Sequence, residues 1–185
     1  MKKDLLKKTI FILLLLPLVY LLVELFIIQE VNDPIKYIYS ITGATALVLL
    51  FFTTSISLWF KKLSKYRKMI GLYGFFYAFL HMLNFLILDM EVDILFAFEE
   101  TLDKPFIYLG MISFLLLLFM AITSTKKLFK KYHSYHKVLY LILTLTSIHF
   151  VMAQKSLSLI QYAYLCIIVI LVIFKIRKYM LKRKR

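Results

Sequence analysis

Hydrophobic and polar positions along the chain form long apolar runs separated by short charged connections. A membrane-spanning helix needs about 20 consecutive, mainly apolar residues. Six runs approach that length, at residues 9–28, 37–60, 69–88, 106–124, 134–152 and 157–174. The purely apolar part of the fifth starts only at Val138, so this run must extend inward through residues 132–137 to cross the bilayer. The pattern predicts an all-α integral membrane protein, a six-transmembrane-helix bundle.

The first run has the basic start and apolar middle of a secretory signal peptide. It is long for one, it carries Glu24, and no small-residue cleavage site stands before Asn32. We therefore interpret it as a membrane span. Pro17 interrupts the run and predicts a kink, because proline removes a hydrogen bond from a helix interior.

The connections between the runs alternate in charge. Lys and Arg cluster at residues 2–8, 61–68, 126–137 and 175–185. The other connections hold eight of the ten acidic residues, namely Glu30, Asp33, Asp89, Glu91, Asp93, Glu99, Glu100 and Asp103. Because cytoplasmic connections carry the excess of Lys and Arg, we expect both termini to be cytoplasmic. In the outer segment Val92–Asp103, apolar and acidic residues mix, which predicts a short surface helix or a docking surface.

Composition excludes several other classes of protein. The net charge of +14 suggests nucleic acid, but the basic residues lie in short clusters between apolar runs rather than on one polar face. We therefore expect contact with membrane lipid and no nucleic acid. Cys166 is the one cysteine and lies in an apolar run, so there is no disulfide framework and no paired-cysteine metal motif.

Two of the four histidines, His81 and His149, lie within apolar runs, where an ionisable residue indicates a functional site. His81 is 13 residues from Lys68, and His149 is 13 residues from His136, so each lies ~20 Å from the inner edge at 1.5 Å per residue. Two imidazoles at equal depth on different helices suit the two axial positions of a haem iron. Two axial histidines leave no open position on the iron, which favours electron transfer over substrate chemistry.

Other polar residues are open to two interpretations. Thr146 and Asn84 lie three residues from His149 and His81, and either orient the imidazoles or bond to backbone carbonyls. Glu24 either extends to the membrane surface or faces the bundle, as a proton-carrying group or beside haem propionates. Two outer cations, Lys104 and Lys155, are candidates for contact with haem propionates.

His136 lies near the predicted inner boundary. It is either a ligand of a second haem or an interfacial histidine in a basic connection. A partner for it is not evident, because the matching position on the third run is Arg67. His133, three residues away, is an alternative partner.

Four segments carry a resemblance to a known family. They are DPIKYIYSITGATAL at 33–47, KMIGLYGFFYAFLH at 68–81, KPFIYLGMISFLLLLFMAITS at 104–124 and HKVLYLILTLTSIHF at 136–150. In this order they resemble the haem-binding membrane subunits of bacterial periplasmic methionine-sulfoxide reductase systems (MsrQ, formerly YedZ). These subunits belong to the ferric-reductase-like transmembrane group. The resemblance covers nearly the whole chain and implies a single ferric-reductase-like transmembrane domain over residues 1–185.

The resemblance implies a haem b cytochrome, multi-pass in the bacterial inner (plasma) membrane. Electrons from the quinol pool or a cytosolic flavin reductase would pass to a periplasmic molybdopterin enzyme that reduces methionine sulfoxide in proteins. The chain would be an electron-transfer subunit, not catalytic alone. The haem-ligand positions of the family fall on His81, His149 and His136, with one or two haems, and FMN has also been attributed to the family. The related NADPH oxidases have a fourth histidine where this chain has Arg67.

Two features qualify what the resemblance implies. Relatives often carry an arginine where this chain has Ala44. The chain ends without a GxGxxG nucleotide-binding motif after the last run, so we expect reductant from a separate carrier.

Two other functions fit the pattern. A proton-linked small-solute transporter would use Glu24 and the histidines as a relay. A non-catalytic membrane scaffold subunit would tolerate loss of His81 and His149 with packing losses only.

Overall fold

The computed structural model describes residues 2–59 and 61–154 and, beyond these, residues 162, 163, 166–170, 173 and 177. Regular structure in this part of the chain is helical throughout. Its elements are α1 (Lys2–Val23), η1 (Glu24–Ile28), α2 (Pro34–Trp59), η2 (Lys61–Tyr66), α3 (Arg67–Leu83), η3 (Asn84–Asp89), α4 (Ile94–Asp103), α5 (Pro105–Thr123), α6 (Lys126–Tyr132), η4 (His133–Val138) and α7 (Leu139–Met152).

The described residues include five helical stretches long and apolar enough to cross a membrane. These are Leu5–Ile28, Pro34–Ile56, Leu63–Asp89, Pro105–Thr123 and Lys126–Met152. They correspond to the first five predicted runs, and the fifth does extend inward as expected. The predicted sixth run, 157–174, lies largely outside the described residues. The all-α, multi-pass prediction is thus confirmed for the part of the chain that the structure describes.

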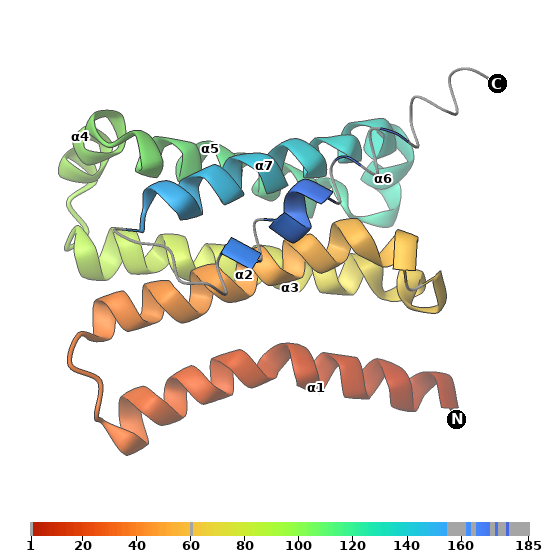
Figure 1. The fold of residues 1–185 in the computed structure, drawn as a ribbon, viewed down its shortest axis with the longest axis horizontal. Helices are drawn as coiled ribbons and strands as arrows, with labels where there is room; N and C mark the ends of the chain where they lie inside the picture. Colours follow the sequence, from red (N-terminus) through yellow and green to blue (C-terminus); the bar gives the residue numbers. More distant parts are fainter. Residues whose placement is uncertain are drawn as a thin grey trace.

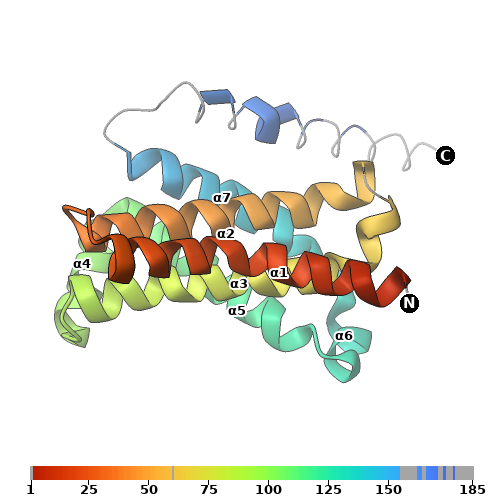
Figure 2. The same ribbon diagram turned by 90° about the horizontal axis from the view of Figure 1, so that it is seen from below.

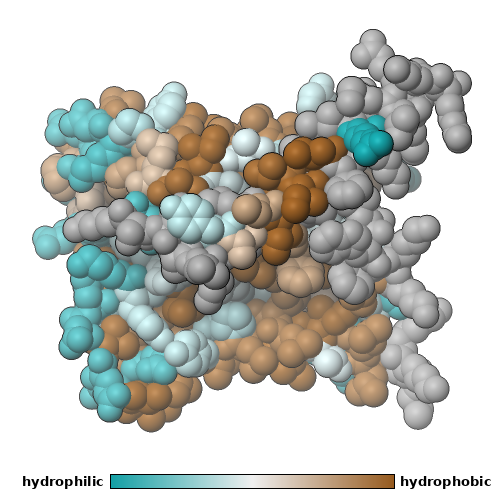
Figure 3. All heavy atoms as spheres, in the orientation of Figure 1, coloured by the Kyte–Doolittle hydropathy of each residue, from teal (hydrophilic) through white to brown (hydrophobic). Residues whose placement is uncertain are grey.

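The long helices run side by side, and their connections gather at two opposite ends (Figures 1 and 2). The α1–α2 connection and α4 lie at one end, and η2 and α6 lie at the other (Figure 1). A hydrophobic band covers the middle of the visible face, with hydrophilic residues along the left edge, where α4 lies in the same view (Figure 3). The connections that carry most of the acidic residues therefore share one end of the bundle.

The α1–α2 connection is organised by a local ion pair. Lys36 Nζ lies 2.6 Å from Asp33 Oδ2, and the Lys36 backbone N–H donates to Asp33 Oδ1. The side-chain hydrogen bond from Lys36 lowers the pKa of the Asp33 carboxyl, so this carboxyl stays charged.

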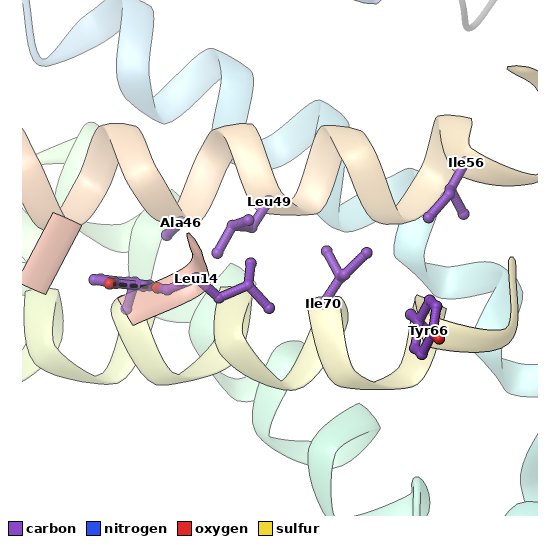
Figure 4. Packing of buried hydrophobic residues seen from close by; sticks show 7 residues of the cluster. Leu14, Ala46, Leu49, Ile56, Tyr66 and Ile70 are labelled. Atoms are coloured by element: carbon purple, nitrogen blue, oxygen red, sulfur yellow. Dashed lines mark hydrogen bonds between the residues drawn. The ribbon is translucent and has the colours of Figure 1, made fainter. Parts of the chain in front are cut away.

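α1 packs against α2 and α3 through a buried apolar cluster. Leu14 of α1 points between Ala46 and Leu49 of α2 and Ile70 of α3 (Figure 4). A second cluster, which includes Leu50, Leu117 and Ile142, joins α2 to α5 and α7. In both clusters side chains of different spans interdigitate, and this packing fixes how the helices are rotated against each other.

Tyr77 of α3 holds the proline-containing part of α1. Its side chain is fully buried, and its hydroxyl donates to the Leu14 carbonyl at 2.8 Å and accepts from the Leu18 N–H at 3.1 Å. In a regular helix these two backbone groups bond to each other. Pro17 lies between them, so the phenol satisfies the backbone where the proline disturbs it.

The predicted short outer helix is present as α4. Asp93 caps its first turn by accepting from the Phe96 N–H at 3.0 Å. One face is buried through Ala97 and Thr101. The structure thus confirms a helix in this outer segment.

Candidate functional site

His81 of α3 and His149 of α7 face each other across the interior of the bundle. Their ring centroids are 6.1 Å apart, and the ring planes are nearly perpendicular, at 86°. Two residues 68 positions apart in sequence therefore lie side by side. This agrees with the prediction of equal depth, which counted 13 residues along each helix to its histidine. At this separation the two imidazoles are candidates for the ligands of one metal ion.

The His149 imidazole is oriented by the first turn of α5. Its Nδ1 lies 2.6 Å from the carbonyl oxygen of Phe106. A carbonyl oxygen can only accept, so Nδ1 carries the proton. In a neutral imidazole the other nitrogen, Nε2, then has a free lone pair, which is the form that binds metals. Ligating histidines commonly donate their second N–H to a backbone carbonyl in this way.

The His81 imidazole is oriented by α2. Its Nδ1 lies 3.3 Å from the Thr42 hydroxyl oxygen. The hydroxyl of this buried threonine donates to the Ile38 carbonyl at 2.5 Å, so toward His81 it acts as an acceptor. The Tyr39 ring packs edge-on against the same imidazole, with centroids 5.0 Å apart, and its hydroxyl donates to Asp89 at 2.9 Å. His81 Nε2 is left as the ligand atom.

Each imidazole also lies against a glycine of the helix that orients it. A Cβ at Gly43 of α2 would stand 2.9 Å from His81 Cε1, and a Cβ at Gly110 of α5 would stand 2.9 Å from His149 Cε1. The backbone of a neighbouring helix therefore approaches each ring more closely than any side-chain-bearing residue would permit.

The residues at this site fit a haem held between the two histidines. Within the described residues, neither Nε2 atom makes a hydrogen bond, and both Nδ1 atoms do. Asn84, one turn beyond His81, is buried, and its Oδ1 has no hydrogen-bond partner in the described part of the chain. Two neighbouring imidazoles with Nε2 free of hydrogen bonds, and an unpaired polar atom one helical turn from one of them, are expected where a ligand completes the site.

The two candidate orienting residues of the sequence analysis do not contact the imidazoles. The Thr146 hydroxyl donates to the carbonyls of Ile142 and Leu143, so the backbone interpretation is confirmed. Asn84 Nδ2 donates to the Ile35 carbonyl at 3.2 Å. The groups that do orient the rings are Thr42 and the Phe106 carbonyl.

A signal for Thr42 was available in the sequence. Thr42 lies eight residues from Pro34, at the outer start of its run, and His81 lies eight residues from Asp89, at the outer end of its own. Counting from the outer edge would have placed both at one depth. A backbone carbonyl such as that of Phe106 gives no such signal.

His136 lies apart from this pair, ~20 Å inward along the same helix at 1.5 Å per residue. Its Nε2 lies 3.1 Å from the Thr123 hydroxyl, and its ring packs edge-on against Phe129. His133 is exposed, with Nδ1 3.4 Å from the Lys130 carbonyl. In the described part of the chain, neither ring contacts another imidazole, and no group of three or more metal-binding side chains occurs.

The remaining polar candidates lie elsewhere. Glu24 lines an open hollow of about 560 Å³ between η1 and the start of α2, together with Tyr20. Lys104 pairs with Glu100, and Lys155 lies outside the described residues.

The fold and the opposed histidines define a multi-pass helical membrane protein with a pair of candidate metal ligands. The chain belongs to the ferric-reductase-like transmembrane family: the family described as "Ferric reductase like transmembrane component" matches residues 11–151. It is similar to proteins of Brucella ovis, Brucella canis and Brucella suis, each named "Protein-methionine-sulfoxide reductase heme-binding subunit MsrQ".

Each of these relatives is 31% identical over 161 residues, which are 82% of this chain and 73% of the relative. The resemblance read from the four segments is therefore confirmed. No solved structure matches the chain.

Proposed function

We propose that this chain is a haem b cytochrome that carries electrons through the bacterial inner membrane. The observation that carries the proposal is the opposed pair His81 and His149, each with Nδ1 engaged by a neighbouring helix and Nε2 free. The names of the relatives support haem as the group between them. Bound there, haem would supply a one-electron carrier held by His81 and His149.

The chain's own residues would hold and insulate this group. The Phe106 carbonyl and the Thr42 hydroxyl fix the two imidazoles in the tautomer that presents Nε2. Hydrogen bonds to both Nδ1–H groups also make the imidazoles more basic ligands. The rings of Tyr39 and Phe106 pack against the imidazoles and keep water from them. A dry, apolar setting of this kind is one means by which a protein sets the redox potential of a metal site.

The charge of the connections supports one orientation of the chain in the membrane, and this orientation gives the proposed direction of electron transfer. We propose six spans with both termini cytoplasmic, so that the end carrying α4 faces the periplasm. The His81–His149 pair then lies in the outer half of the membrane, close to a periplasmic acceptor. That acceptor is proposed to be a molybdopterin enzyme that reduces methionine sulfoxide in proteins, with the quinol pool or a cytosolic flavin reductase as donor. A second haem at His136 and an FMN site stay predictions.

The alternative functions gain no support from the geometry. A proton relay needs Glu24 near the histidines, but Glu24 lines the hollow between η1 and α2, whose lining residues include no histidine. A scaffold subunit gives no reason for two imidazoles inside apolar spans to lie side by side with both Nε2 atoms free of hydrogen bonds among the described residues.

Two single variants test the proposal. We expect His81→Ala and His149→Ala each to abolish stoichiometric haem binding in the purified protein. Each variant keeps only one of the two proposed histidine ligands, and a single ligand holds haem weakly. His133→Ala is the matched control, since His133 is exposed and its contacts are a carbonyl and a ring within its own connection. Full haem content in either His81→Ala or His149→Ala would refute the proposal that the two histidines bind one haem together.

A further inference from the structure

Gly43 and Gly110 occupy equivalent places beside the two histidines. A Cβ at Gly43 would lie 2.9 Å from Cε1 and 3.0 Å from Nδ1 of His81. A Cβ at Gly110 would lie 2.9 Å from both Cε1 and Nδ1 of His149. Non-bonded heavy atoms are most stable about 3.5–4.0 Å apart, so a methyl group at either place would force the imidazole to move.

The two sites share a second feature. The helix that supplies the glycine also supplies the oxygen that binds Nδ1. Thr42 directly precedes Gly43, and the Phe106 carbonyl lies one turn before Gly110. Each imidazole is thus located by two contacts from one neighbouring helix, a hydrogen bond to Nδ1 and a close contact between the ring and the glycine backbone.

The other two glycines of the chain differ. A Cβ at Gly71 would stand 3.4 Å from the Thr53 methyl, and a Cβ at Gly74 would stand 3.5 Å from Leu49 Cβ. These are ordinary van der Waals distances, and neither glycine faces an imidazole. Small residues often serve only to let membrane helices approach. At Gly43 and Gly110, however, the atoms that a methyl would meet belong to the histidine rings.

We infer that Gly43 and Gly110 are positioning residues for His81 and His149. Because neither glycine has a side chain, each imidazole can lie against the neighbouring helix, and this fixes the position of its ligand nitrogen. This inference rests on the proposed function, since the positions matter through the haem that the histidines hold. Neither residue touches the reacting iron; each acts through the imidazole that lies against it.

The test compares Gly43→Ala and Gly110→Ala with Gly71→Ala and Gly74→Ala as matched controls. All four changes add one methyl group to a helix, and alanine favours a helix more than glycine does. Loss of helix stability therefore cannot explain a difference between the pairs. We expect haem affinity to fall about 10–100-fold in the Gly43 and Gly110 variants, as for other changes to groups that orient a metal ligand. The controls should bind as the unchanged protein does.

Spectroscopy separates displacement of a ligand from general damage. Haem retained by Gly43→Ala or Gly110→Ala should show high-spin character in its optical and electron paramagnetic resonance spectra, because one imidazole is displaced, and its midpoint potential should shift. The controls should stay six-coordinate and low-spin. Size-exclusion profiles in detergent check that each variant is folded, and each position is tested by its own variant.

The outcomes distinguish this inference from the proposed function. Unchanged haem affinity, spectra and potential in both Gly43→Ala and Gly110→Ala would overturn the positioning role while the cytochrome remained. An equal loss in the controls would overturn it as well, because the effect would then be general. Absence of haem from the unchanged protein would overturn the proposed function itself.

Discussion

At the scale of single residues, the candidate site depends on one hydroxyl, one carbonyl and two missing side chains. Of these groups, Thr42 is the one whose removal best tests how a neighbour affects His81 as a metal ligand, because the Thr42 hydroxyl accepts a hydrogen bond from Nδ1–H. The side chain is fully buried, so water cannot replace it when it is removed. The strength of this hydrogen bond should therefore be visible in the redox potential of the bound haem.

We expect Thr42→Val to raise the midpoint potential of the haem and to weaken haem binding. Without the Thr42 hydroxyl as an acceptor for Nδ1–H, His81 becomes a less basic ligand and stabilises the ferric state less. Thr42→Ser keeps the hydroxyl and should behave nearly as the unchanged protein. Thr53→Val controls for loss of a buried threonine, since within the described residues the Thr53 hydroxyl bonds to the Leu49 carbonyl alone. A potentiometric titration in which Thr42→Val and Thr53→Val give equal potentials would contradict the role of Thr42.

The sequence was sufficient to identify His81 and His149 as a candidate pair, because an imidazole is rare in an apolar run and depth can be counted along a helix. It was not sufficient to identify their neighbours. Thr42, Gly43 and Gly110 are of residue types common in membrane helices, and their role depends on how α2 and α5 are rotated. That rotation is set by packing between helices, which no local pattern records.

At the scale of elements, two spans end in a π-helical turn, at Glu24–Ile28 and Asn84–Asp89. Neither turn was predicted, because an extra residue within one turn leaves no periodic signature in a run that is apolar all round. The spans themselves were predictable from length and apolar content. A kink at Pro17 of α1 stays a prediction, and the Tyr77 phenol that bonds to the backbone on either side of Pro17 comes from a distant part of the chain.

We expect Tyr77→Phe to destabilise the packing of α1 by about 1–2 kcal/mol, since it leaves the Leu14 carbonyl and the Leu18 N–H without the phenol that joins them. The measurement is thermal denaturation in detergent. Tyr73→Phe is the matched control, because Tyr73 lies on the same helix and packs against the same cluster, and its hydroxyl makes no hydrogen bond among the described residues. Equal melting temperatures for the two variants would show that the phenol bridge contributes nothing.

At the scale of the whole molecule, the segregation of acidic and basic connections predicts one orientation in the membrane. In a Cys166→Ser background, a membrane-impermeant maleimide should label Glu91→Cys from the periplasmic side. It should label Lys127→Cys only after the membrane is permeabilised. Both positions are exposed, so accessibility to the reagent depends on the side of the membrane. The reverse labelling pattern would place the His81–His149 pair near the cytoplasm and remove the proposed direction of transfer.

The most direct test of the central claim is the absorption spectrum of the chain purified in mild detergent, recorded oxidised and dithionite-reduced with a haem-to-protein ratio. The account predicts sharp reduced α bands of b type and one haem per chain held by His81 and His149. A ratio near two would add His136 as the ligand of a second haem. A visible spectrum without bands, from cells well supplied with haem, would contradict the account and leave the opposed histidines without their proposed role.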